Sequence, residues 1–326
     1  MENRSLLITG TTHFIATYLA EQLVRSGNNV KALIPYSYQS SLGTLGRLPL
    51  YIRSEIEVIS GSLTNSETID YAVKDASIVF HFGVFDMLPS HTNARDYLEK
   101  TVIGTFNVLN AARKYGVEKL VHISTDEVYG DVEDIPINEK SPLEARSPQN
   151  GSDIGAEKLV EGYFWSYSLP VAIARLSNTY GPAQSRSAIV PTIVTQALVG
   201  KELFLGDMHA IRDFVYVKDV VQGLIKIAEV PETVGEAINL GSGQGISIGE
   251  LADRIVSLLG KDIEILFDAT RIRLHSSGIR KLVLDIAKAK NLLGWQPETS
   301  LDDGLKQTIE WFFEQAELNP IKDRED

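Results

Sequence analysis

The first 125 residues alternate short apolar runs with stretches of helical periodicity, and this alternation constrains the fold more than any other feature. The apolar runs are continuous, which is typical of strands that are buried on both faces. Strands are predicted at Ser5–Thr9, Val30–Ile34, Ile56–Ser60, Ile78–Phe82 and Leu120–Ile123. Helices are predicted near 14–26, 65–74 and 92–115. The pattern therefore predicts an α/β fold with a doubly wound parallel sheet.

The regular alternation loosens after residue 175, which favours a second, smaller lobe. The elements predicted there are strands at 213–217 and 237–240 and helices near 218–229, 247–259, 285–293 and 301–317. We expect residues 1–176, together with about 212–242, to form the first domain. Residues 177–326 are expected to supply an interleaved α/β lobe over the carboxyl ends of the sheet strands.

Composition excludes several classes of function. The 326 residues contain 31 Lys and Arg against 43 Asp and Glu, a formal net charge of −12, which argues against binding nucleic acid or an anionic membrane. The chain has no Cys, so thiolate chemistry and Cys-bound metals are excluded. No apolar run approaches the roughly 20 residues of a membrane span, and no signal peptide is recognised. We therefore expect a cytoplasmic protein.

A single glycine marks the turn between the first strand and the first helix. Dinucleotide-binding turns need three small residues there, for the tight turn, for approach of the pyrophosphate and for helix packing. Gly10 fills the first position, whereas His13 and Ala16 stand at the second and third. The His13 ring would occupy the place of a pyrophosphate unless it turns to solvent, and the sequence leaves both arrangements open.

Six motifs are spread over almost the whole chain. They are Thr9-Gly10-x-x-x-Phe14-Ile15, His122-Ile123-Ser124-Thr125-Asp126-Glu127-Val128-Tyr129-Gly130, Arg175-x-x-Asn178-Thr179-Tyr180-Gly181-Pro182, Arg212-Asp213-Phe214-Val215-Tyr216-Val217-x-Asp219, Asn239-x-Gly241-Ser242-Gly243 and Leu292-Leu293-Gly294-Trp295-x-Pro297. In this order and spacing they resemble the extended short-chain dehydrogenase/reductase family, specifically its NDP-sugar epimerases and 4,6-dehydratases. The resemblance implies a Rossmann-like sheet, a C-terminal substrate lobe and a sugar-nucleotide ligand.

The redox pair of that family is absent at its expected place. The family uses a Tyr-x-x-x-Lys pair, in which Tyr transfers a proton and Lys lowers its pKa. The flanking residues align Gln149 with the Tyr and Asp153 with the Lys. Gln cannot ionise, and Asp inverts the charge that the Lys would supply.

Further positions on the cofactor side also depart from the family pattern. Ser62 stands where the resemblance implies an Asp, and Thr101 where it implies an Asn. The stretch His81-Phe82-Gly83-Val84 stands where the resemblance implies a small Ala-Ala pair that lines the cofactor. Together with His13 and Asp153, these changes argue against the usual NAD(P) redox cycle. We predict no bound cofactor, and NAD(P) is implied by the family resemblance alone.

The sugar-nucleotide side is better preserved. The resemblance places Asn178 and Arg212 against the nucleoside diphosphate, and Arg271 and Arg273 in the segment that usually supplies a phosphate-binding Arg. Bidentate pairing of Arg with phosphate suits a diphosphate, so a UDP- or dTDP-sugar is the predicted ligand. The alternative is that residues 271–281 form an ordinary solvated basic loop.

Thr125, Asp126 and Glu127 follow the fifth predicted strand. In the dehydratases that the chain resembles, the Thr bonds the sugar 4-oxygen and the two acids serve the elimination of water. Neighbouring carboxyl groups can act as acid and base when their surroundings separate their pKa values. The alternative is that the three residues merely end the strand and begin the next turn.

Three functions remain open from the sequence. The first is an unconventional NDP-sugar lyase or isomerase, for example one that acts on a 4-keto sugar nucleotide. The second is an inactive binding or regulatory subunit, and the third is a conventional NAD-dependent 4,6-dehydratase or epimerase. The resemblance implies a homodimer through a four-helix bundle formed by the helices near 92–115 and 150–168, or a heterodimer with an active paralogue.

Overall fold

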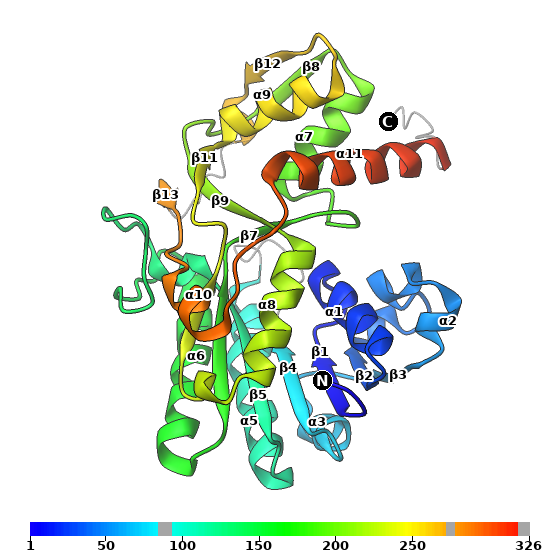
Figure 1. Cartoon of the computed structure of the whole chain (residues 1–326), viewed down its shortest axis with the longest axis vertical. Helices are drawn as coiled ribbons and strands as arrows, with labels where there is room; N and C mark the ends of the chain where they lie inside the picture. Colours follow the sequence, from blue (N-terminus) through cyan, green and yellow to red (C-terminus); the bar gives the residue numbers. More distant parts are fainter. Residues whose placement is uncertain (84–92, 272–277, 319–326) are drawn as a thin grey trace.

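A seven-stranded parallel sheet forms the centre of the computed structural model, which describes residues 1–83, 93–271 and 278–318 (Figure 1). The strand order is β10-β6-β5-β4-β1-β2-β3, and every neighbouring pair is parallel. The strands are β1 (Ser5–Thr9), β2 (Asn29–Ile34), β3 (Ile56–Ser60), β4 (Ile78–Phe82), β5 (Lys119–Thr125), β6 (Val171–Leu176) and β10 (Ala237–Leu240). The doubly wound sheet and the five strands predicted for the first half are confirmed.

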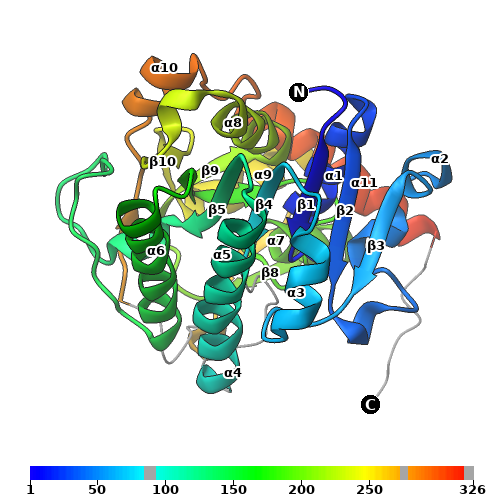
Figure 2. The same ribbon diagram turned by 90° about the horizontal axis from the view of Figure 1, so that it is seen from below.

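Both faces of the sheet are buried, which explains the continuous apolar runs. Leu6 and Ile8 belong to one hydrophobic cluster, while Leu7 between them belongs to the other. Helices α3, α5 and α6 cover one face and lie side by side (Figure 2). Helices α1 and α8 cover the opposite face.

The helices associated with the sheet begin and end close to the predicted positions, apart from a short helix at Leu50–Arg53 that was not predicted. They are α1 (Phe14–Arg25), α2 (Leu50–Arg53), α3 (Ser66–Val73), α4 (Ala94–Leu98), α5 (Gly104–Tyr115), α6 (Pro148–Tyr167) and α8 (Val217–Glu229). The helix predicted near 92–115 consists of α4 and α5, joined by a π-helical turn at Glu99–Ile103. This turn packs against α6.

A second lobe lies over the carboxyl ends of the central strands (Figure 1). It holds a four-stranded sheet and a two-stranded sheet. Its elements are β7 (Asn178–Tyr180), α7 (Ile189–Val199), β8 (Glu202–Leu205), β9 (Ile211–Tyr216), β11 (Gly245–Ser247), α9 (Ile248–Leu259), β12 (Glu264–Phe267), β13 (Lys281–Leu282) and α11 (Leu301–Leu318). Helix α10 (Ala287–Leu293) returns to pack against β10 and α8.

The chain passes repeatedly between the two lobes. Strand β9 belongs to the second lobe, whereas the following α8 and β10 return to the central sheet. The contribution of residues 212–242 to the sheet therefore starts at Val217. No helix in the described part of the chain is long and apolar enough to cross a membrane.

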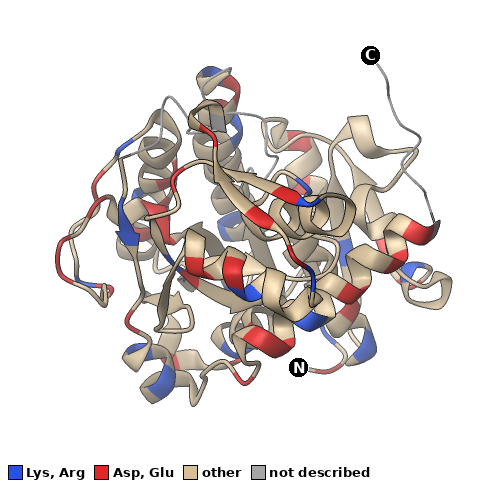
Figure 3. Ribbon diagram, turned by 90° about the horizontal axis from the view of Figure 1, so that it is seen from above, with Lys and Arg blue, Asp and Glu red and all other residues tan. Residues whose placement is uncertain are grey.

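Acidic residues are distributed unevenly over this framework. Helix α11 carries five acids and a single Lys, and its acidic positions follow one another along the helix (Figure 3). Part of the net negative charge is therefore concentrated on the second lobe.

Candidate functional site

The candidate site lies where β5 ends and α6 begins. Thr125 is the last residue of β5, and Asp126 and Glu127 start a 3-10 turn that runs to Tyr129. The Thr125 hydroxyl accepts a hydrogen bond from the backbone N–H of Glu127 at 3.2 Å, which caps this turn. The local fold thus places the two carboxyl groups next to each other at the carboxyl end of a central strand, where open α/β sheets bind ligands.

The two neighbouring acids have different surroundings. Asp126 is only 2 % exposed, and its Oδ2 has no hydrogen-bond partner among the described residues. Burial raises the pKa of Asp126 well above its usual value, and the charges of Glu127 and Asp213 raise it further. Glu127 is half-buried, and its Oε2 accepts a hydrogen bond from Asn150 Nδ2 at 3.0 Å. Two carboxyl groups can serve as acid and base when their surroundings differ in this way.

Helix α6 carries the two positions aligned with the Tyr-Lys pair. Ser147 caps the helix by accepting a hydrogen bond from Asn150 N, so Gln149 and Asp153 lie in its first two turns. Asp153 Oδ1 accepts a hydrogen bond from the Tyr97 hydroxyl at 2.9 Å, while Asp153 Oδ2 is buried without a partner. Burial raises the pKa of Asp153 to about 7, against the opposing effect of the Tyr97 hydrogen bond.

Tyr97 was not predicted as a site residue. It lies on α4, one turn before Thr101, and is almost completely buried. Burial and the neighbouring Asp153 raise the pKa of Tyr97, so its hydroxyl remains protonated and donates to Asp153. In the sequence, Tyr97 lies one helical turn before Thr101 within a predicted helix, and this spacing was the available signal. Its partner on α6, Asp153, is distant in the sequence.

Glu157, one turn after Asp153, is neutralised by a different group. It forms a buried ion pair with Arg175, with Nη2 of the Arg 2.7 Å from Oε2 of the Glu. Arg175 Nη1 also donates to the Tyr129 hydroxyl at 2.9 Å. Both charges are thus satisfied within the core, and this pair supports the site structurally.

Several buried polar atoms around the two acids lack hydrogen-bond partners within the described residues. They are His122 Nδ1, Ser124 Oγ, Asp126 Oδ2, Asn150 Oδ1 and Asp153 Oδ2. All of them come from β5, the turn after it or the start of α6, and these elements pack together. Buried polar atoms are normally paired in native proteins, so such a concentration is a feature of the site.

The glycine turn after β1 is closely packed. Gly10 has φ +64°, and a Cβ at this position would lie 2.8 Å from the Cβ of Phe82. His13 caps α1, where its Nδ1 accepts a hydrogen bond from Ile15 N at 3.3 Å. Its ring is half-buried, and desolvation lowers its pKa to about 3. The ring thus occupies one of the N-terminal amides that a pyrophosphate would use.

The segment after β2 folds over the same turn. The Thr44 hydroxyl lies 3.1 Å from the backbone oxygen of Thr12 and 2.6 Å from the hydroxyl of Thr17. Dinucleotide-binding folds place an acid after this strand to bind the adenosine ribose. This chain has no Asp or Glu between Glu21 and Glu55, and Pro35 directly follows β2.

The predicted phosphate-binding residues are only partly described. Asn178 begins β7 and Arg212 lies on β9, where its guanidinium bonds the backbone oxygens of Ile211 and Ile279. Arg271 ends a 3-10 turn, and Arg273 lies outside the described residues. Strand β9, which carries Arg212, pairs with β13 at the end of the basic segment 271–281.

Asp213 follows Arg212 on β9 and holds the loop Gly241-Ser242-Gly243 in place. Its carboxylate accepts hydrogen bonds from Ser242 N at 2.7 Å, Gly243 N at 3.0 Å and Leu284 N at 3.2 Å. Asp213 thereby ties three segments of the second lobe together beside Asp126. Its role is one of support, since the donors around its carboxylate are backbone amides and the hydroxyls of Ser177 and Ser242.

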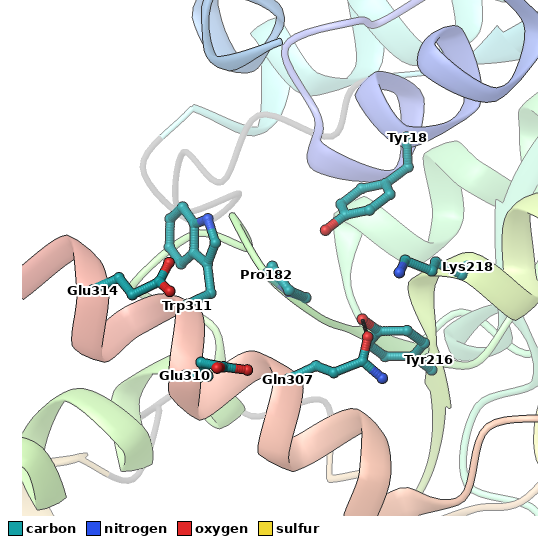
Figure 4. Close-up of a pocket in the computed structure, with 8 residues that line it drawn as sticks. All are labelled: Tyr18, Pro182, Tyr216, Lys218, Gln307, Glu310, Trp311 and Glu314. Carbon is teal, nitrogen blue, oxygen red and sulfur yellow. Dashed lines mark hydrogen bonds between the residues drawn. The ribbon is translucent and has the colours of Figure 1, made fainter. Parts of the chain in front are cut away.

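A separate pocket of about 270 Å³ lies between α1 and α11 (Figure 4). Its lining residues are Tyr18, Pro182, Tyr216, Lys218, Gln307, Glu310, Trp311 and Glu314. The Tyr216 hydroxyl donates to Gln307 Oε1 at 2.9 Å, which links β9 to α11. Across 1–83, 93–271 and 278–318, no cluster of three or more His, Asp or Glu side chains is arranged to hold a metal ion.

Comparison with known proteins places this architecture among nucleotide-sugar enzymes. The chain is 29% identical to the dTDP-glucose 4,6-dehydratase of Streptomyces antibioticus, over 98% of this chain and 96% of that protein. It is also 30% identical to the trifunctional UDP-glucose 4,6-dehydratase/UDP-4-keto-6-deoxy-D-glucose 3,5-epimerase/UDP-4-keto-L-rhamnose-reductase RHM2 of Arabidopsis thaliana, over 96% of this chain. This match covers 48% of RHM2, so the chain spans about half the length of that relative.

A solved structure and a family model agree with these matches. The dTDP-glucose 4,6-dehydratase of Bacillus anthracis, crystallised with NAD, superposes with a TM-score of 0.84 at 28% identity, over 96% of this chain and 98% of that chain. The family model described as GDP-mannose 4,6 dehydratase matches residues 7–308. The chain therefore belongs to this family of extended short-chain dehydrogenases/reductases, the NDP-sugar 4,6-dehydratases and epimerases.

Proposed function

We propose that this protein is an unconventional NDP-sugar lyase or isomerase that binds a UDP- or dTDP-sugar and works without the usual Tyr-Lys-NAD redox cycle. The observation that carries the proposal is the pair of adjacent carboxyl groups, the buried Asp126 and the half-buried Glu127, at the end of β5. The names of the relatives, which act on UDP- and dTDP-glucose, support the ligand class.

The chemistry requires a substrate that already carries a keto group at C4. A keto group acidifies the neighbouring C–H, so a carboxylate can remove that proton without prior oxidation of the sugar. Glu127 would accept the proton, and Asp126, whose pKa is raised by burial, would act as the acid. Return of a proton to carbon gives isomerisation, whereas protonation of a departing hydroxyl releases water. Thr125 would hold the sugar oxygen.

The residues present fit NAD(P) poorly. The position aligned with the ribose-binding Lys holds Asp153, and Gln149 cannot transfer a proton. The His13 ring and the Thr44 hydroxyl interact with the turn that would receive the pyrophosphate. For this reason we assign no step of the reaction to a nicotinamide.

Hydrogen exchange at carbon tests the proton transfers directly. With UDP- or dTDP-4-keto-6-deoxyglucose in D2O, the wild type is expected to incorporate deuterium next to the keto group, as measured by NMR. Asp126→Asn and Glu127→Gln should each slow this exchange about 100-fold or more. Glu133→Gln, at an exposed position, is the matched control. Exchange that is equally fast in all variants would contradict the assignment.

Thermal shift separates this function from the conventional one. Saturating UDP-glucose or dTDP-glucose is expected to raise the melting temperature by a few degrees, and NAD or NADP is expected to leave it unchanged. Stabilisation by NAD comparable to that by the sugar nucleotides would favour a conventional 4,6-dehydratase or epimerase instead.

An inactive binding or regulatory subunit is the second candidate. It is favoured by the loss of the Tyr-Lys pair together with exposed apolar residues on the helices that would pair with another subunit. Ile103, Phe106 on α5 and Trp165 on α6 are 44%, 42% and 80% exposed. Absence of exchange on every NDP-4-ketosugar, combined with co-purification of an active paralogue, would support this candidate.

A further inference from the structure

The carboxyl groups of the site lack a positive counter-charge. Asp126, Glu127 and Asp153 form no ion pair with any described Lys or Arg, and the hydrogen-bond donors of Glu127 and Asp153 are the neutral Asn150 and Tyr97. Arg212 is the basic residue that acts on Asp126, and its positive charge lowers the pKa of Asp126. Its guanidinium group, however, donates its hydrogen bonds to backbone oxygens. Arg175 is committed to Glu157.

The partnerless atoms of the site are mostly acceptors. Asp153 Oδ2 and Asn150 Oδ1 are both buried and unpaired, and they lie three residues apart on α6, where side chains share one face. Asn150 is fully buried, and the unpaired Ser124 Oγ and Asp126 Oδ2 belong to the end of β5 and the turn after it, which pack against α6. A ligand that satisfies these atoms has to bring hydrogen-bond donors.

An ammonium group meets both requirements, because it carries a positive charge and three N–H donors. We propose that Asp153 and Asn150 bind an ammonium substituent of the sugar, so that the ligand is an amino-sugar nucleotide. This inference rests on the proposed function, since it takes the sugar nucleotide as the ligand of the same site. Solvent does not reach these oxygens in the free chain, so neighbouring side chains must shift as the ligand enters.

The Tyr97 hydroxyl fixes the orientation of the carboxyl group. Its hydrogen bond to Asp153 Oδ1 leaves Oδ2 as the free acceptor. At pH 7.5 the ammonium would further favour the ionised form of Asp153, whose pKa of about 7 results chiefly from burial. When the ligand binds, its ammonium group would thus take the place of the proton on the Asp153 carboxyl group.

Matched ligand pairs test the inference by isothermal titration calorimetry at pH 7.5. The pairs are UDP-glucosamine with UDP-glucose, and dTDP-4-amino-4,6-dideoxyglucose with dTDP-6-deoxyglucose, with UDP and dTDP measured alone. In at least one pair the ammonium ligand is expected to bind about tenfold more tightly than the hydroxyl ligand, which is the effect of one charge-assisted hydrogen bond. Asp153→Asn should reduce this preference to within about twofold of unity.

Glu161→Gln provides the control, because Glu161 lies two turns further along α6 and pairs with Lys158 at the surface. It should retain the full preference for the ammonium ligand. Equal binding within both pairs, or a preference that persists in Asp153→Asn, would overturn the inference while binding of UDP or dTDP upholds the ligand class. Absence of binding by every nucleotide would overturn the proposed function together with the inference.

Discussion

Asp153 destabilises the folded protein at a position where we propose that it binds the ligand. Its Oδ2 is buried without a partner, and such a group costs about 1–3 kcal/mol in the folded state. A Lys at this position would have met Glu127 and Glu157 with the opposite charge, whereas the Asp adds to their repulsion. A residue that disfavours folding and repels its neighbours is consistent with a role in binding.

Asp153→Asn is therefore expected to stabilise the protein in a pH-dependent way. The pKa of Asp153 is about 7 in the folded state and about 3.9 in an unfolded chain. Between these values the folded state keeps a proton that the unfolded state has released, so the carboxyl group increasingly disfavours folding as the pH rises from about 4 to 7. Above pH 7 its unfavourable contribution is constant.

Urea unfolding of the wild type and Asp153→Asn at pH 4.5 and pH 8 measures this effect. The variant should gain about 1–3 kcal/mol in the free energy of unfolding at pH 8 and much less at pH 4.5. The difference between the two proteins isolates Asp153 from His13 and His122, whose lowered pKa values act in the opposite direction at low pH. A variant less stable than the wild type at pH 8 would contradict the argument.

At this scale the sequence located the residues of the candidate site, but it did not reveal their contacts. Spacing within the motifs located Asp126, Glu127 and Asp153. The hydrogen bond between Tyr97 and Asp153 joins residues 56 positions apart, and no local pattern encodes it. The sequence also left two orientations open for the His13 ring, and capping of α1 by its Nδ1 provides a physical reason for the observed one.

At the scale of elements, periodicity predicted six of the seven strands of the central sheet and most of its helices, because each has a buried apolar run or face. The strand that it missed is β6. Helix α7 and strands β8 and β12 were not predicted. Helix α7 is apolar over most of its length, so it offers little helical periodicity, and β8 and β12 have only four residues each. Their pairing joins segments about 60 residues apart, which local patterns do not reveal.

The prediction about the oligomeric state concerns helices α5 and α6. Ile103, the last residue of the π-helical turn, and Phe106 on α5 lie three residues apart and are both exposed, so they share a face that a second subunit would cover. Replacing both by Glu would bury two charges in such an interface at several kcal/mol each. We expect the wild type to be a dimer and the double variant a monomer at micromolar concentration, as measured by light scattering after gel filtration.

Phe267→Glu is the control for this experiment. Phe267 is similarly exposed, at 58%, but it ends β12 in the second lobe, far from α5 (Figure 1). The control should remain dimeric. If it dissociates as well, or if the α5 variant stays dimeric, the interface does not lie on these helices.

At the scale of the whole molecule, the two lobes share one hydrophobic cluster and several chain crossings. The sequence predicted two lobes, because the pattern changes after residue 175. It did not predict how α11 is anchored. The Tyr180 hydroxyl donates to Leu301 O at 3.1 Å, and Gly304 lets the helix approach closely, since a Cβ there would overlap the Tyr180 side chain.

Arg47 and Trp311 link the two lobes, and Trp311 also lines the pocket of Figure 4. Arg47 ends a turn that follows β2, and its guanidinium carbon lies 5.4 Å from the centre of the Trp311 ring on α11. A cation–π contact at a partly exposed position contributes about 0.5–1 kcal/mol. The double-mutant cycle of Arg47→Ala and Trp311→Ala in urea unfolding should give a coupling free energy of this size.

A second cycle distinguishes this contact from general destabilisation. Arg25 also lies in the first lobe, but it contacts Glu21 and Tyr51 instead of α11. Arg25→Ala and Trp311→Ala should therefore be additive within about 0.5 kcal/mol. Coupling that is equally large in both cycles would mean that Trp311 acts through the stability of the whole chain. Coupling confined to Arg47 would show that this contact helps to fix the second lobe over the carboxyl ends of the sheet, where Asp126 and Asp153 lie.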